Sequence, residues 1–203
     1  MDNIILLLGI QGVILGLGNG VSPGPVTSVI VLNSINKNFS SGLLTALTPV
    51  IAGAPIVAGT IFLGSEIIEN DNILSYIQVI GGLVLLLLGF YSIKSSFKKM
   101  ENKSKQTVGM APALLLTVFN PAPYLFWTLV GLPLYKRYET LSSAALTLFF
   151  VTFFISLFLG GAFYAVLANE VKKRGNSLII DNVNSVLGFL IIILGAKTIY
   201  EVF

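Results

Sequence analysis

The sequence predicts an all-α integral membrane protein of six transmembrane helices, built as two inverted three-helix repeats whose first helices, 1 and 4, are broken. Three observations predict this fold class. Hydrophobic residues make up 55% of the 203 residues and charged residues only 10%, against a charged share of about 25% in soluble domains. Long stretches contain no charged residue at all, and two Pro-x-Pro motifs lie in corresponding stretches of the two halves.

Six stretches are apolar enough to cross a membrane. Five of these stretches contain no charged residue, and residues 72–93 are the shortest of the five. About 20 apolar residues in a helix span the hydrocarbon core, so each of the five is long enough. The sixth, residues 182–196, suffices if Ile179 and Ile180 join it and if Asp181 and Lys197 extend toward the interfaces. Runs without polar alternation exclude a membrane barrel. We therefore predict helices over about 4–32, 41–65, 73–95, 108–133, 142–168 and 177–200.

The basic residues predict the orientation of these helices. With six spans, the first, third and fifth loops share one side, and they hold nine of the twelve Lys and Arg residues: Lys37, Lys94, Lys98, Lys99, Lys103, Lys105, Lys172, Lys173 and Arg174. Lys136, Arg137 and Lys197 are on the other side. Because basic loops stay in the cytoplasm, we expect a multi-pass protein of the cytoplasmic membrane with both termini outside.

No stretch is long enough for a separate soluble domain, so we expect one transmembrane domain over residues 1–203. Repeat 1 covers about 1–95, a basic cytoplasmic loop covers about 96–107, and repeat 2 covers about 108–203. The first helix is expected to stay in the mature protein, because it lacks the positively charged leader of a signal peptide.

Two matched features support the repeat. Ser22-Pro-Gly-Pro25 corresponds to Asn120-Pro-Ala-Pro123, and the glycine-bounded stretch 82–89 corresponds to 188–195. The glycines alone are typical of helix packing in any membrane bundle. Three spans per half is an odd number, so the halves must be inverted relative to each other, as in many secondary transporters.

Each Pro-x-Pro removes two N–H donors and must open its helix. Paired breaks in corresponding helices are a sequence pointer to a substrate site, because broken helices in lipid are tolerated where they line a cavity. Freed carbonyls suit an ammonium group, and the N-terminus of each following half-helix suits a carboxylate. The alternative is that the prolines only kink the helices, with nearby polar side chains satisfying the backbone. Pro49 and Pro55, on either side of Gly53, predict a further irregular helix.

The candidate substrate-binding residues are the polar and proline residues of the two breaks. They are Asn19, Ser22, Pro23, Gly24, Pro25, Thr27, Asn120, Pro121, Pro123 and Tyr124. Ser28, Thr117 and Thr128 lie nearby in the sequence. Phe126 and Trp127 either line the cavity or serve as packing and interfacial anchors, with packing favoured, whereas Tyr124, next to Pro123, is the better candidate for the cavity.

The composition argues against other classes of protein. Cysteine and histidine are absent, which removes thiol nucleophiles, imidazole bases and most metal sites. We therefore expect no enzyme activity, no cofactor and no metal, and nothing indicates a nucleic-acid partner or a nucleotide-binding loop. A channel-forming or structural membrane subunit is the alternative to a carrier. Homo-oligomer formation is left open.

The stretch from Gly20 to Thr27 (GVSPGPVT), the later GLLTAL from Gly42, and Asn120-Pro121 resemble the lysine exporter (LysE/RhtB) family of translocators. The resemblance implies an exporter of amino acids or related small solutes, driven by an ion gradient. It assigns importance to Pro23, Gly24, Pro25, Asn120 and Pro121. Many members carry an aspartate in the second helix, where this chain has the uncharged residues Gly53 and Ala54. That departure favours a neutral or differently coupled solute.

Overall fold

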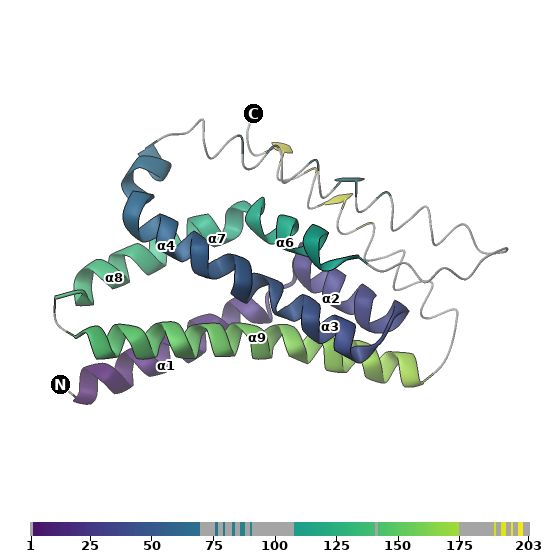
Figure 1. The fold of residues 1–203 in the computed structure, drawn as a ribbon, viewed down its shortest axis with the longest axis horizontal. Helices are drawn as coiled ribbons and strands as arrows, with labels where there is room; N and C mark the ends of the chain where they lie inside the picture. Colours follow the sequence, from purple (N-terminus) through teal and green to yellow (C-terminus); the bar gives the residue numbers. More distant parts are fainter. Residues whose placement is uncertain are drawn as a thin grey trace.

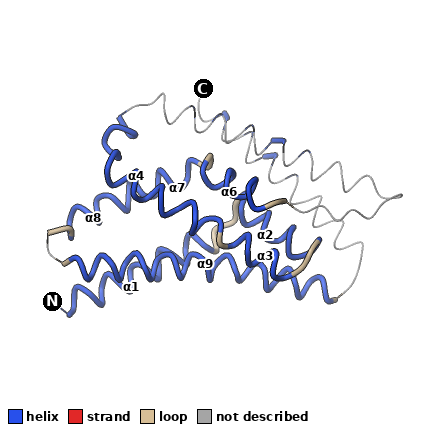
Figure 2. The backbone as a smooth tube through the Cα atoms, viewed as in Figure 1, coloured by secondary structure: helices blue, strands red, loops and turns tan. Residues whose placement is uncertain are grey.

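The computed structural model describes residues 2–69, 108–140 and 142–174, with isolated positions between 76 and 90 and between 189 and 200 (Figure 1). Regular structure in these ranges is entirely helical (Figure 2). The predicted helices 73–95 and 177–200 and the basic loop 96–107 lie outside the described residues. The elements are α1 (Asp2–Gly20), α2 (Pro25–Asn36), α3 (Phe39–Ala46), α4 (Thr48–Glu69), α6 (Met110–Val118), α7 (Pro121–Phe126), the π-helical turn η1 (Trp127–Gly131), α8 (Leu132–Tyr138) and α9 (Ser143–Lys173).

Three stretches of the described chain are long and apolar enough to cross a membrane: Asn3–Gly20, Phe39–Leu63 and Ser143–Lys173. A fourth span arises if Met110–Val118 and Ala122–Tyr138 are counted together, since they form a pair bent by 44°. The described part is thus an all-helical, multi-pass membrane structure, as its composition predicts. The full count of six spans stays a prediction.

The first Pro-x-Pro interrupts a helix, as predicted. α1 ends at Gly20 and α2 begins at Pro25, with Gly24 in an extended conformation before it. Pro25 has no N–H, so it leaves the carbonyl of Val21, four residues earlier, without its helical donor. The predicted helix 4–32 is therefore two helices, and the second continues to Asn36.

The second Pro-x-Pro interrupts the chain between α6 and α7. The side chain of Asn120 accepts a hydrogen bond from the backbone N–H of Ala122 at 3.0 Å and so caps α7. Farther along, the N–H of Leu132 reaches back to the carbonyl of Trp127, which is the wide i to i−5 bond of a π turn. Pro133 explains this turn, because a proline ring clashes with the carbonyl four residues earlier in a regular α-helix. The helix then runs to Tyr138, beyond the predicted end at 133.

The helix with Pro49 and Pro55 is less irregular than the breaks on either side of it. Only Leu47 separates α3 from α4, and Pro55 lies inside α4. α9 is the longest described helix, and it starts where Ser142 accepts a hydrogen bond from the N–H of Ala145. It is a continuous span that extends a few residues past the predicted end at 168.

α1 and α9 are held together by a glycine face on α1. A side-chain carbon at Gly12, Gly16 or Gly20 would collide with backbone carbonyl oxygens of α9. One at Gly160 of α9 would come within 2.7 Å of the Cα of Gly20. Small residues at this spacing let two backbones approach closely in a membrane, so α1 and α9 form one tightly packed pair.

The two halves of the chain also meet through α2 and α6. Val29, Leu32, Ala113 and Leu116 form a buried apolar cluster. Beside it Asn33, which is 3% exposed, bonds to the backbone of Val108, just before α6. This contact joins the end of α2 to the start of α6.

The broken helices run in opposite directions. α1 starts at the end where α8 finishes, whereas α2 leads to the opposite end, from which α6 starts back (Figure 1). Lys37 and Lys172 share that second end, since the Lys172 ammonium donates to the Lys37 carbonyl at 2.9 Å. Both interruptions therefore lie between the two ends of the bundle.

Candidate functional site

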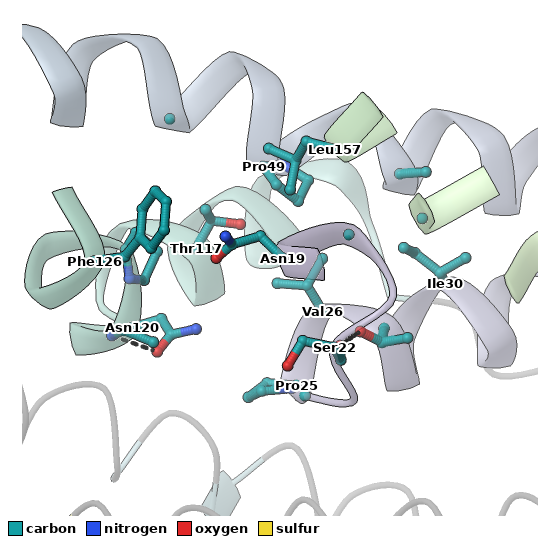
Figure 3. A pocket seen from close by; sticks show the side chains of 18 of the residues that line it. Asn19, Ser22, Pro25, Val26, Ile30, Pro49, Thr117, Asn120, Phe126 and Leu157 are labelled. Atoms are coloured by element: carbon teal, nitrogen blue, oxygen red, sulfur yellow. Dashed lines mark hydrogen bonds between the residues drawn. The ribbon is translucent and has the colours of Figure 1, made fainter. Parts of the chain in front are cut away.

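A cavity of about 380 Å³ lies between the two breaks (Figure 3). Its walls come from the α1–α2 break, α3, α4, the α6–α7 break, η1 and α9. Segments about a hundred residues apart in the sequence thus enclose one space. A cavity of this size falls within the range of small-molecule sites, about 300–1,000 Å³.

The first break contributes one amide and one open helix end. The Asn19 side-chain nitrogen donates to the carbonyl of Leu15 at 2.9 Å, which leaves its side-chain oxygen for the cavity. Figure 3 shows Asn19 extending toward the side where Asn120 and Phe126 lie. No side chain caps the N-terminus of α2. The N–H groups of Val26 and Thr27, in its first turn, therefore have no acceptor within the helix.

The second break offers a different set of groups. The Asn120 oxygen is engaged by the N–H of Ala122, so its amide nitrogen is the group left over. In Figure 3 that nitrogen points toward Ser22 and Pro25 of the first break. Pro121 and Pro123 occupy the first turn of α7 and have no N–H. The two half-helix ends are thus unequal: α2 has open backbone donors, and α7 is capped.

Two tyrosines satisfy carbonyls that the breaks set free. The hydroxyl of Tyr164, on α9, donates to the carbonyl of Val21 at 2.7 Å. The hydroxyl of Tyr124 donates to the carbonyl of Val118 at 2.9 Å. The expectation that freed carbonyls would receive an ammonium group does not apply to these two, because a phenol already occupies each.

The structure brings most of the sequence candidates to the cavity. Those that line it are Asn19, Ser22, Pro23, Gly24, Pro25, Thr27, Asn120 and Pro123. Pro121 begins α7 between two lining residues, Asn120 and Ala122. Tyr124 is not among the lining residues, since its hydroxyl is directed to the backbone of α6. Thr117 lines the cavity, and Ser28 and Thr128 do not.

The aromatic wall of the cavity includes two residues, Phe153 and Phe154, that were not anticipated from the sequence. It consists of Phe126, Trp127, Phe153 and Phe154. Trp127 is buried against Gly131, where any side chain would collide with the indole ring. The Phe149-Phe150 and Phe153-Phe154 pairs, four residues apart on one helix face, were the sequence signal for such a cluster.

Polar and apolar groups, without charge, make up the described lining. Amides, hydroxyls and open N–H groups lie at the breaks, and aromatic rings and prolines lie beside them. Among the described residues no group of three or more His, Asp or Glu side chains could hold a metal ion. The arrangement is suited to reversible binding of a small solute that has a polar end.

A family model for LysE type translocators matches residues 19–202. The chain belongs to the LysE type translocator family. The match begins at Asn19, a cavity-lining residue in the last turn of α1, and it includes both Pro-x-Pro motifs. No curated protein and no solved structure matched the chain.

Membership confirms the resemblance seen in the motifs. As a LysE type translocator, the chain is a membrane protein that transports small solutes, with the bilayer around its apolar helices. Gly53 lines the cavity with no side chain of its own. The ring of Phe154, on α9, lies next to it.

Proposed function

We propose that this LysE type translocator is a secondary transporter that exports amino acids or related small solutes across the cytoplasmic membrane. It works by alternating access and draws on an ion gradient. The observation that carries the proposal is that two helix breaks, one from each half of the chain, line a single cavity. Substrate sites of secondary transporters lie where discontinuous helices of two repeats meet.

The directions of the broken helices support a repeat architecture. α1–α2 and α6–α8 run oppositely (Figure 1), which is the relationship expected of inverted repeats with three spans each. We propose one transmembrane domain of six helices, with both termini outside. The two halves then exchange exposure of the cavity between the two sides of the membrane.

The groups left open at the breaks match an amino acid. A carboxylate fits the uncapped N-terminus of α2, where the N–H groups of Val26 and Thr27 and the helix dipole favour negative charge. The free amide nitrogen of Asn120 adds a donor from the opposite break. The free oxygen of Asn19 is an acceptor for the amino group. The carboxylate of an amino acid thus meets hydrogen-bond donors, and its ammonium group meets an acceptor.

The packing of α2 against α6 at one end of the described structure favours a carrier over an open pore. The cluster of Val29, Leu32, Ala113 and Leu116 fills the space between α2 and α6 at one end. A channel needs a continuous path in one conformation, whereas a carrier needs such a plug on one side at a time.

Counterflow in proteoliposomes tests the proposal. Vesicles loaded with unlabelled amino acid should accumulate labelled amino acid transiently and with saturation, and imposed proton or sodium gradients should drive net flux. Asn19→Ala should raise the KM, whereas Asn3→Ala, an exposed asparagine at the far end of α1, should not. Unsaturable flux would instead indicate a channel, and absence of any flux from inserted protein would indicate a structural subunit.

A further inference from the structure

We infer that the cavity selects amino acids whose side chain is uncharged and apolar, with the aromatic wall as the receiving surface. This inference rests on the proposed function and names the class of solute that the same site accepts. Its basis is the division of the lining into two kinds of surface. The breaks supply donors and acceptors for the backbone end of an amino acid, and Phe126, Phe154 and Leu157 supply an apolar face.

The rings of the wall are fixed by other rings behind them. Trp127 is 4% exposed and Phe153 is 2% exposed, and their ring centroids lie 4.8 Å apart in an edge-to-face arrangement. Phe126 stacks on Phe153 at 5.6 Å, and Phe154 stacks on Trp127 at 6.3 Å. Contacts of this geometry are favourable for aromatic pairs. The two partly exposed rings, Phe126 and Phe154, therefore meet a solute as a preorganised surface.

Gly53 of α4 widens this surface. A side-chain carbon at Gly53 would lie 3.1 Å from Cε1 of Phe154, closer than ordinary van der Waals contact. The glycine therefore leaves the face of α4 open to the Phe154 ring, and both residues line the cavity. Pro49, one turn earlier on α4, continues the apolar lining.

The energetics favour an apolar side chain at this wall. Moving a hydrocarbon side chain from water onto rings and prolines gains about 25 cal/mol for each Å² of apolar surface removed from water. A charged side chain would lose its hydration there, and the described lining provides no opposite charge to compensate. Stacking partners also cover a face of Phe126 and of Trp127, which reduces the ring surface available to a cation.

Competition in the counterflow assay tests the selectivity of the wild-type protein. Leucine and phenylalanine should compete at least about tenfold better than serine, lysine or glutamate, the scale at which hydrophobic pockets discriminate. Equal or better competition by lysine, glutamate or serine would overturn the inference while leaving the transporter proposal standing. Absence of counterflow with any amino acid would overturn both.

Variants of the wall assign the selectivity to its residues. Phe154→Ala should raise the KM for leucine and phenylalanine about tenfold and that for alanine less than about threefold. Gly53→Ala should raise the KM for phenylalanine, because the added methyl group displaces the Phe154 ring. Gly59→Ala is its matched control on α4, since a side chain there meets nothing within 4 Å. If inserted Gly53→Ala protein and the Gly59→Ala control show the same KM for phenylalanine, the wall does not set specificity.

Discussion

Asn33 and Val108 are joined by two hydrogen bonds that connect the two halves of the chain. The Asn33 amide nitrogen donates to the Val108 carbonyl at 3.0 Å, and its oxygen accepts from the Val108 N–H at 2.9 Å. The same nitrogen donates to the hydroxyl of Thr45 at 2.7 Å. Because Asn33 is buried, every polar atom of its side chain is satisfied only while α2, α3 and the start of α6 stay together.

We predict that Asn33→Ala makes the cavity more accessible from the end at which this contact lies. The chain contains no cysteine, so a single Ser22→Cys exchange provides a unique label inside the cavity. Losing the two hydrogen bonds to Val108, at about 1 kcal/mol each, should speed its alkylation from that end about thirtyfold. Ser34→Ala is the control, because the Ser34 hydroxyl donates to the carbonyl of Ile30 within α2. Equal labelling rates in the two variants would show that Asn33 does not hold this end closed.

Replacing Pro23 and Pro25 together by alanine should abolish transport while the protein still inserts. Alanine restores the missing N–H groups and removes the ring clashes, so α1 and α2 can merge and the open N-terminus of α2 disappears. Flux in proteoliposomes measures the loss, and the membrane-extracted fraction reports insertion. Wild-type flux from inserted protein would contradict the role of the break.

Tyr164→Phe should weaken transport through the backbone of the first break. The exchange removes only the hydroxyl that satisfies the Val21 carbonyl, at a cost of about 1 kcal/mol. We expect a higher KM, since the position of the α1–α2 break changes, and Tyr124→Phe should act likewise at the second break. In Tyr135→Phe, where no hydrogen bond of the hydroxyl is found in the described part of the chain, the KM should stay constant. A KM for Tyr164→Phe equal to that of Tyr135→Phe would refute the positioning role.

Gly16→Ala should destabilise the α1–α9 pair. The added methyl group would collide with the carbonyl oxygen of Phe153, and such overpacking costs about 1–3 kcal/mol. Thermal unfolding in detergent should occur several degrees lower, at about 2–4 °C for each kcal/mol. Gly18→Ala, where a side chain meets nothing within 4 Å, should unfold at the wild-type temperature. A similar melting temperature for both variants would mean that close backbone contact contributes little.

Cysteines at Lys136 and Lys173 should label from opposite faces of the membrane. Both side chains are largely exposed, at 61% and 64%. Lys136 lies in the last turn of α8 and Lys173 is the last residue of α9, at opposite ends of the bundle. The excess of basic residues predicts that Lys173→Cys is reached only from the cytoplasm and Lys136→Cys only from outside. Labelling from the same face would overturn the topology, and the reverse pattern would overturn the orientation.

The sequence predicted the breaks because their cause is local. A proline removes its own N–H and collides with a carbonyl four residues earlier. At each break two prolines spaced two apart impose both effects twice, whereas the single Pro55 lies inside α4. The ring clash also accounts for the π turn before Pro133, although this turn was not anticipated. The partners of Asn33 and Val21 could not be foreseen, because each contact joins residues that lie far apart in the chain.

The side chains that face the cavity were harder to predict than the breaks. Tyr124 was favoured over Phe126 and Trp127, and the structure places the last two along the cavity instead. Tyr124 instead directs its hydroxyl to the carbonyl of Val118, at the end of α6. That contact depends on how α6 and α7 are arranged around the break, which the local sequence does not show.

The glycine face of α1 also affects the order in which the helices can pack during synthesis. α1 leaves the ribosome early, but the helix that fits its glycines begins only at Ser143. At about 5–20 residues per second, translation of the intervening chain takes on the order of ten seconds. During that interval α1 is in the membrane or beside the insertion machinery without α9, the helix against which its glycines pack in the finished structure. Slowed elongation or truncation before α9 would leave the nascent chain in that exposed state.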